Sequence, residues 1–153
     1  MENIIWMRPA SFLSVFILLA LFELFVPFRE NKNKWARYKV NFSLLLISII
    51  CSRIVLPYGL IRLSEWGMSN GLGVFNHMVF DLIPLYVLGI IHFIFLDFMI
   101  YFQHRMMHLI PFLWRFHRPH HLDEVLDVST GIRFHPVEMV ISLLFKALLI
   151  VTA

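Results

Sequence analysis

The stretch DFMIYFQHRMMHLIPFLWRFHRPHH, residues 97–121, decides the fold and the chemistry of this chain. His104 and His108 are spaced i, i+4, which places both imidazoles on one side of a helix. His117, His120 and His121 are spaced i, i+3, i+4 and again share one side of a helix. Histidines from two short helical segments can therefore converge on one place.

Asp97 and Tyr101 extend the histidine-bearing side of the first helix backwards. At about 100° per residue, these two residues and the i, i+4 histidine pair fall within an arc of about 60°. We therefore predict that Asp97 and Tyr101 support catalysis by orienting the ligands or the substrate.

The ligand types available to the chain favour a metal held by imidazoles. Neutral imidazole suits iron, zinc and copper, and the neighbouring Arg105 and Arg118 disfavour the protonated form. The single cysteine, Cys51, excludes a thiolate cluster, and the lack of a Glu-x-x-His pair argues against a carboxylate di-iron bundle. A basic patch of interfacial histidines is the plainer alternative, but it does not explain the repeated spacing.

Prolines divide the stretch into its two helical segments. Pro111 is expected to end or sharply bend the first helix, because proline lacks an N–H and clashes with the preceding turn. The following residues 113–116 mix aromatic and basic side chains, as interfacial segments do. Pro119 is compatible with the second histidine helix if that helix starts there.

Outward from this stretch, the composition is that of a membrane protein. The chain has 153 residues, of which 59% are hydrophobic and 16 are phenylalanine, and its mean hydropathy is +0.77. A membrane span needs about 20 predominantly apolar residues. We predict an all-α integral-membrane helical bundle, one domain over residues 1–153, with about four spans or part-spans. The predicted spans are about 11–28, 40–61, 84–103 and 137–153, with an outer loop over 63–83.

The positions of the basic residues indicate how the chain is oriented in the membrane. The net charge is +3, but Lys and Arg lie at the ends of apolar segments and form no basic face interleaved with aromatics, so nucleic-acid binding is not expected. Nine of the thirteen fall within residues 29–39 and 105–133. By the positive-inside rule, both regions, and with them the interfacial histidine-bearing segment, are cytoplasmic.

Several polar residues receive no role in the predicted site. His92 projects from a different side of the third apolar stretch, and His77 lies in the predicted outer loop, so both are excluded as ligands. Arg53 is expected to reach the outer interface if its helix ends near Pro57. No role is assigned to Glu23, Arg53 or Lys146.

The residues quoted above carry a family resemblance. The run from Asp97 to His121 resembles the fatty acid hydroxylase/sterol desaturase superfamily, with its pattern Asp-x3-Tyr-x2-His-Arg-x2-His, then Pro-x-Leu-Trp, then His-x2-His-His. The segment TGIRFHPVE that follows is also similar to that family, which gives a histidine-box segment over residues 97–138.

The resemblance implies an integral-membrane oxidoreductase that binds two metal ions, usually iron, and uses O2 with electrons from a separate donor. The implied reactions on lipids are C–H hydroxylation, desaturation and, in one branch, ether-lipid cleavage. The implied metal ligands are His104, His108, His117, His120 and His121. His135 is implied only as a residue near the site, in a second shell or on the substrate side; as a plainer alternative, it starts the helix at Pro136.

The sequence departs from the family pattern by lacking a third box, another His-x2-His-His. We expect that the chain is truncated, that a C-terminal segment or a second chain completes the metal site, and that this fragment alone is inactive. Two other hypotheses stay open: a non-catalytic membrane protein that binds a metal or haem, and an assembly protein.

The topology is testable by cysteine accessibility. With Cys51 replaced by Ser, single cysteines at positions 33 and 125 should both react with a membrane-impermeant reagent from the cytoplasmic side, because both lie in the basic regions. Labelling from opposite sides would refute the predicted orientation.

Overall fold

The computed structural model describes residues 2–26, 33–74, 83–123 and 126–152. These residues form helices and no strand, so the predicted all-α class is confirmed for them. The elements are α1 (Glu2–Phe25), α2 (Lys34–Val55), α3 (Gly59–Ser69), α4 (Leu85–Leu109), α5 (Pro111–His121), the 3-10 helix η3 (Val128–Ile132) and α6 (Pro136–Thr152).

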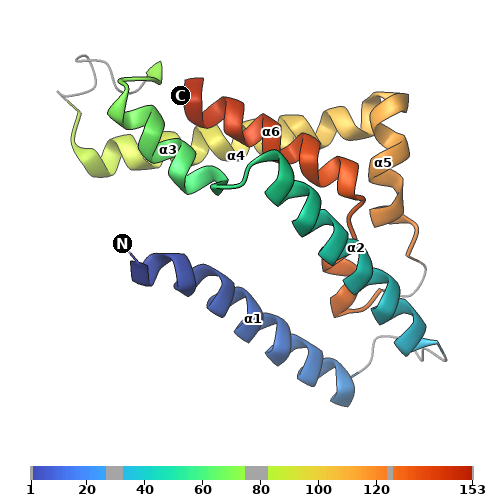
Figure 1. Ribbon diagram of the computed structural model, residues 1–153. Coiled ribbons are helices and arrows are strands. Elements are labelled where there is room, and N and C mark those ends of the chain that lie inside the picture. The colour runs from blue at the N-terminus through green and yellow to red at the C-terminus, as the bar shows by residue number, and fades with distance from the viewer. Residues whose placement is uncertain (1, 27–32, 75–82, 124–125, 153) are drawn as a thin grey trace.

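The helices pack as a bundle with α6 in the middle. Helix α6 contacts α2, α3, α4 and α5, and η3 packs against α2 and α1. In Figure 1, α5 turns away from the end of α4, and α1 lies apart from the other long helices along most of its length. The turn between α4 and α5 brings the two histidine-bearing segments together beside the start of α6.

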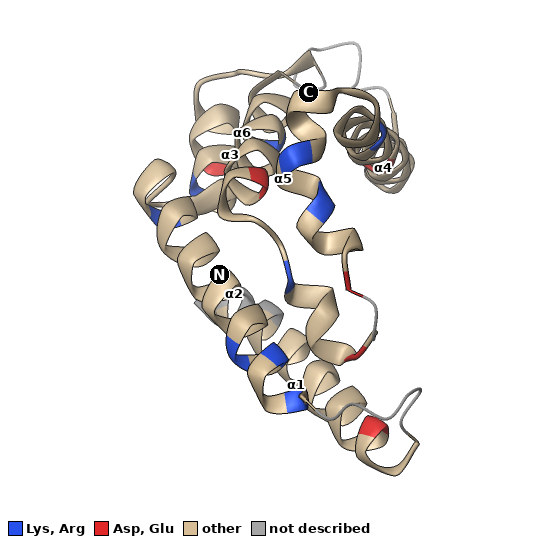
Figure 2. Ribbon diagram, turned by 90° about the vertical axis from the view of Figure 1, so that its right-hand side faces the viewer, with Lys and Arg blue, Asp and Glu red and all other residues tan. Residues whose placement is uncertain are grey.

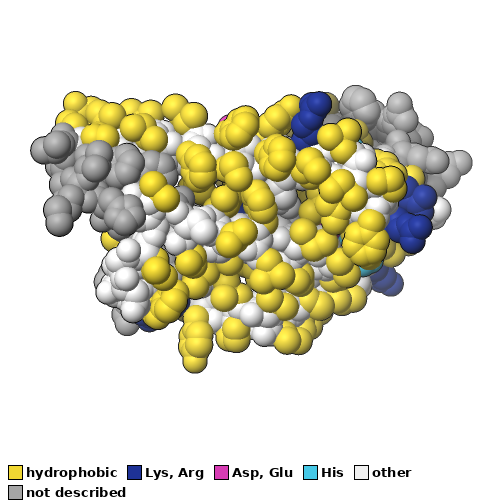
Figure 3. Space-filling view, turned by 90° about the horizontal axis from the view of Figure 1, so that it is seen from above, with side chains coloured by type: hydrophobic (Ala, Val, Ile, Leu, Met, Phe, Trp, Pro, Cys, Tyr) yellow, Lys and Arg dark blue, Asp and Glu magenta, His cyan; other side chains and the backbone are white. Residues whose placement is uncertain are grey.

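Little of the apolar surface is buried within the chain. Among the described residues, only Met107, Ile132 and Leu149 are buried apolar side chains. Hydrophobic side chains cover most of the face seen in Figure 3, and Lys and Arg gather at one end of it. Such a surface needs an apolar surrounding.

Two helical stretches have the length and composition of membrane spans, Leu85–Leu109 and the stretch Lys34–Ser69, which includes the turn between α2 and α3. Helix α1 contributes a shorter apolar stretch, Pro9–Phe25, and α6 is also shorter than a standard span. The prediction of four spans or part-spans therefore stays a prediction.

The helix that contains most of the second predicted span has different bounds at both ends. Helix α2 begins at Lys34 rather than at residue 40 and ends at Val55 rather than at 61. Pro57 has no N–H to continue the helix and restricts Leu56, and Gly59, with a φ of +73°, lets the chain turn into α3. Arg53 lies in the last turn of α2 and donates to the carbonyl of Pro57. That Arg53 reaches the outer interface stays a prediction.

The predicted outer loop is wrong over residues 63–69, which belong to α3. Glycines suggested a loop there, but Gly67 is helical and buried, and packing of α3 against α6 stabilises the helix. Residues 75–82, which include His77 of the predicted loop, lie outside the described residues.

The two prolines of the histidine stretch act differently from one another. Helix α4 ends at Leu109 and Pro111 takes the first position of α5, so the break predicted at Pro111 is confirmed. The expectation that the second histidine helix starts at Pro119 is wrong, because Pro119 lies inside α5. The helix ends two residues later, at His121.

Helix α1 also extends beyond its predicted range, beginning at Glu2 instead of residue 11 and containing Pro9. It ends at Phe25, and residues 27–28 of the predicted span lie outside the described residues. Of the other two predicted spans, 84–103 overlaps α4, which continues to Leu109, and 137–153 overlaps α6, which begins at Pro136.

A polar contact between α4 and α6 gives a test of this packing. The side-chain amide of Gln103 donates to Ser142 Oγ at 2.5 Å. Hydrogen bonds between membrane helices contribute about 0.6 kcal/mol on average. In a double-mutant cycle of Gln103→Ala and Ser142→Ala, thermal unfolding in detergent should give a coupling energy of about this size. Strictly additive losses would show that the two helices do not meet there.

Candidate metal centre

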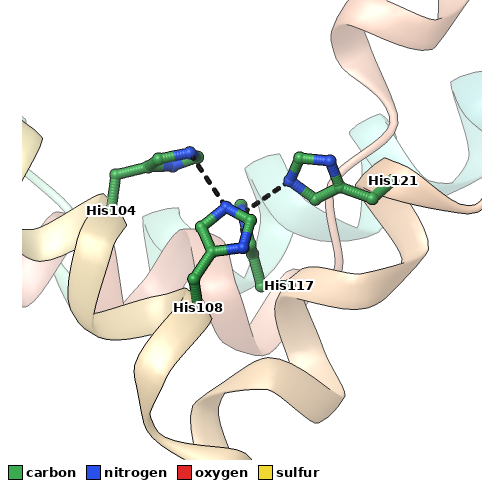
Figure 4. Close-up of side chains that lie close together, drawn as sticks. All are labelled: His104, His108, His117 and His121. Carbon is green, nitrogen blue, oxygen red and sulfur yellow. Dashed lines mark hydrogen bonds between the residues drawn. The ribbon is translucent and has the colours of Figure 1, made fainter.

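Four imidazoles from α4 and α5 point at a common centre (Figure 4). The Nε2 atoms of His104 and His108 are 3.2 Å apart, those of His108 and His117 are 3.2 Å apart, and those of His117 and His121 are 2.9 Å apart. One ligand atom from each of the four histidines lies within 4.8 Å of all the others. The i, i+4 spacing on each helix thus produces the convergence that the sequence predicts.

Hydrogen bonding alone accounts poorly for these contacts. A neutral imidazole nitrogen either carries a hydrogen and donates, or carries one in-plane lone pair and accepts. The Nε2 atoms of His108 and His117 each face two other Nε2 atoms, so three hydrogen bonds of good geometry cannot form together. A cation that accepts one lone pair from each nitrogen accounts for every contact.

The spacing of neighbouring nitrogens is similar to that on a single metal ion. Imidazole nitrogens bind Zn²⁺, for example, at about 2.0–2.1 Å, so two of them on one tetrahedral ion lie about 3.3 Å apart. The observed separations between neighbouring nitrogens, 2.9–3.2 Å, are close to this edge length. The four ligand atoms lie within 4.8 Å of one another, so the outer rings would have to move closer for all four to bind one ion. The donor set suits iron, zinc or copper equally, and the geometry does not select among them.

Electrostatics keeps the innermost ligand in the form that binds metal. His117 is fully buried. Burial first, and then the neighbouring His108 and His120, lower the pKa of His117 from 6.5 to about 4. Burial and the other histidines also lower the pKa of His121. Both rings are therefore inclined to be neutral at neutral pH, with a lone pair available.

Trp114 covers one side of the cluster. Its ring centroid lies 5.2 Å from that of His108, 5.7 Å from that of His121 and 6.0 Å from that of His117. The indole is placed by the first turns of α5, in the segment that the sequence marks as interfacial. It shields the ligands on that side with an apolar surface.

Residues 89–153 match the family model described as fatty acid hydroxylase. This match, which covers less than half of the chain, supports membership of the fatty acid hydroxylase/sterol desaturase superfamily for that part of it. Comparison with curated proteins and with solved structures gave no match.

His120, the fifth ligand that the superfamily resemblance implies, stands beside the cluster. Its ring stacks on Phe134, with centroids 4.5 Å apart and planes 12° apart, and its centroid lies 5.2 Å from that of His121. Its Nδ1 is buried without a hydrogen-bond partner among the described residues. Four of the five predicted ligands are thus brought together, and a ligand role for His120 stays a prediction.

The supporting residues predicted on α4 are not joined to the histidine rings by any contact among the described residues. Asp97 is exposed, and the Tyr101 hydroxyl accepts a hydrogen bond from Arg105 at 3.4 Å. Their supporting roles in catalysis, of the kind that the superfamily resemblance implies, stay predictions.

His135 and His92 lie outside the cluster. The Nδ1 of His135 accepts from the backbone N–H of Val137, which suits a residue at the start of α6, and its ring lies 5.2 Å from that of Phe116. A second-shell or substrate-side role for His135 stays a prediction. On α4, Nδ1 of His92 bonds the carbonyl of Leu88.

The sequence reasoning missed Glu138, which supports the buried histidine. The Glu138 Oε1 atom lies 2.7 Å from Nδ1 of His117, and Glu138 is itself buried. When Nε2 of His117 binds a metal, Nδ1–H donates to this carboxylate, an arrangement that fixes the tautomer and orients the ring. The signal was present, because Glu138 closes the segment TGIRFHPVE that resembles the superfamily, but nothing in the spacing placed it beside His117.

Replacing Glu138 should therefore weaken metal binding without removing a ligand. Carboxylates that support a ligating histidine typically contribute about 10–100-fold to metal affinity. We expect Glu138→Gln to lower the affinity for Fe²⁺ or Co²⁺ by a factor in this range in a metal titration. Glu65→Gln, on the exposed surface of α3, is the matched control and should leave the affinity unchanged. Equal affinities for Glu138→Gln and the control would contradict the supporting role.

Proposed function

We propose that this protein is a membrane-bound, non-haem iron oxidoreductase that uses O2 to hydroxylate or desaturate a C–H bond of a lipid. The observation that carries the proposal is the convergence of His104, His108, His117 and His121, with one ligand atom each within 4.8 Å, in a chain of this superfamily. The lipid would be a fatty acyl, sterol or ether lipid, the substrate classes that the resemblance implies.

Iron held by these four imidazoles would supply O2 activation and the oxidation of an otherwise unreactive C–H bond. The protein's own part is to hold the ligands. Glu138 accepts the Nδ1 hydrogen of His117, and Trp114 keeps water from one side of the rings. The apolar surface of α4, which leads to His104, offers a path for an acyl or sterol chain arriving from the bilayer.

A site with two irons would need more ligands than the four converging histidines. For a second iron, this chain offers His120, whose buried Nδ1 lacks a partner among the described residues. We propose that the remaining ligands come from residues outside this cluster, in a further segment or a second chain. In hydroxylation, one oxygen atom of O2 is inserted into the C–H bond and the other is reduced to water. In desaturation, both oxygen atoms leave as water, and two of the hydrogens come from the lipid. In both reactions the lipid supplies only two of the four electrons that O2 accepts, so a separate donor must supply the other two.

The location proposed for the site is the cytoplasmic side of a membrane. The apolar helices and the superfamily favour a membrane location. The basic residues near the cluster, Arg105, Arg115 and Arg118, are exposed and favour the cytoplasmic side by the positive-inside rule.

The alternative is a non-catalytic protein that binds a metal or haem, or that acts in assembly. Haem is disfavoured by the geometry, because axial histidines approach a haem iron from opposite faces, with the macrocycle between them. The Nε2 contacts of 2.9–3.2 Å leave no space for a macrocycle between the rings. Iron binding through these histidines without any oxidation of a lipid would support the non-catalytic alternative.

Substitution of the histidines tests the proposal. In the protein whose metal site is complete, His104→Ala, His108→Ala, His117→Ala and His121→Ala should each lower the iron content and abolish lipid oxidation, because each removes one of four converging ligand atoms. His120→Ala should abolish oxidation and lower the iron content only in part, because its ring stands beside the cluster. The measurements are iron per protein and the oxidised lipid formed with O2 and a chemical reductant.

The control is His92→Ala, which removes an imidazole from the same helix as His104 without touching the cluster. It should leave the iron content intact. Equal loss of iron in this control and in the four cluster variants would contradict the assignment of the ligands.

A further inference from the structure

We infer that Arg37 is a positioning residue for the metal centre: it fixes the segment between α5 and α6, which in turn places Phe134 on His120 and Glu138 on His117. The inference rests on the proposed metal site and extends it. Arg37 lies on α2, outside the residues 89–153 that match the family model, so the match itself assigns it nothing.

Arg37 is the centre of a polar junction, which we define as Arg37 and Asn41 of α2 with Asp123, Asp127, Ser129 and Thr130. The Arg37 guanidinium donates to Asp123 Oδ2 at 2.6 Å and lies 3.1 Å from Asp127 Oδ2 and 3.4 Å from Thr130 Oγ1. One side chain thus contacts an aspartate on either side of residues 124–125, just before η3.

The rest of the junction is buried and closely bonded. The Asn41 amide, one helical turn after Arg37, donates to Ser129 Oγ at 2.7 Å, and Ser129 Oγ donates to Asp127 Oδ1 at 2.5 Å. Thr130 Oγ1 donates to Asp123 Oδ2 at 2.6 Å. Both aspartate side chains are no more than 5% exposed and both pair with Arg37, while Arg133 also lies 3.6 Å from Asp123 Oδ2.

The N-terminal helix also contributes to this anchorage. The backbone N–H of Val128 donates to Glu23 Oε2 at 2.8 Å, and Glu23 pairs with Lys34 at 3.0 Å. Glu23, to which the sequence reasoning gave no role, therefore ties α1 to the first turn of η3. In the lower half of Figure 2, Lys and Arg positions lie near Asp and Glu positions, in line with the ion pair that joins Arg37, near the start of α2, to Asp123.

The anchored segment leads directly to the metal centre. Ser48 of α2 donates to the carbonyl of Phe134, whose ring is stacked on His120. Helix α6 begins two residues later, and its first turn carries Glu138, which bonds His117. If Arg37 no longer holds the aspartates, the start of α6 and the Phe134 ring lose their fixed placement relative to α5.

Cobalt binding tests this role because the metal reports on ligand geometry. With Co²⁺ alone as the probe, we expect Arg37→Met to lower the affinity by about tenfold, the lower end of the effect of groups that orient ligands. The ligand-field absorption of bound Co²⁺ should also change. Arg37→Lys, which keeps the charge but not the fork of donors, should restore part of both.

A stability-matched control separates positioning from general loss of folding. Leu149→Ala removes a buried apolar side chain near the far end of α6 and should lower the thermal midpoint without altering the cobalt spectrum. If Arg37→Met cannot be purified folded, Arg37→Lys and Asn41→Ser carry the same comparison. Arg37 or Asn41 variants with the affinity and spectrum of Leu149→Ala would overturn the inference.

His117→Ala distinguishes failure of this inference from failure of the metal centre. A wild-type protein without a cobalt spectrum that depends on His117 would overturn the metal centre and the positioning role together. A wild-type protein that binds Co²⁺ through His117, while the Arg37 variants match Leu149→Ala, would overturn the positioning role alone.

Discussion

The contacts of His117 are the constraint on which the rest of the structure depends. This fully buried ring lies within 3.2 Å of Nε2 atoms on both neighbouring histidines, His108 and His121, and its other nitrogen bonds Glu138. It therefore joins α4, α5 and α6 at one point. Three helices that expose most of their apolar surface meet in a small polar centre, and a metal ion there would add its binding energy to that of the fold.

The distribution of polar contacts explains how a chain with so small an apolar core can hold this centre in place. The chain from η3 to the first turn of α6 connects two polar clusters, the junction around Arg37 and the histidines with Glu138. Side chains of α2 form hydrogen bonds and ion pairs with polar groups of the segment between α5 and α6. That segment leads into α6, the helix that carries Glu138. Hydrogen-bonded charges, more than apolar packing between helices, thus determine where the ligands stand.

The sequence predicted those features that depend on local spacing and composition. The i, i+4 pairs give the convergence of the four histidines, Pro111 gives the break between α4 and α5, and the apolar stretches give the helical class. The superfamily assignment followed from the same residues.

Features that depend on contacts between distant residues could not be predicted. Glu138 lies 21 residues after His117, and Arg37 lies 86 residues before Asp123, so no periodicity relates either pair. Helix α3 was mistaken for a loop, because its glycines outweighed a stabilisation that comes from packing against α6. His120 has the spacing of a ligand, but stacking on Phe134 directs its ring beside the cluster.

X-ray absorption spectroscopy at the iron edge tests the central claim most directly, that imidazoles of the cluster bind one metal ion together. For the iron-loaded protein, the claim predicts a first shell dominated by nitrogen and an outer-shell pattern of several imidazole rings, reduced in His117→Ala. A first shell of oxygen alone, or an imidazole pattern that survives removal of His117 unchanged, would contradict it.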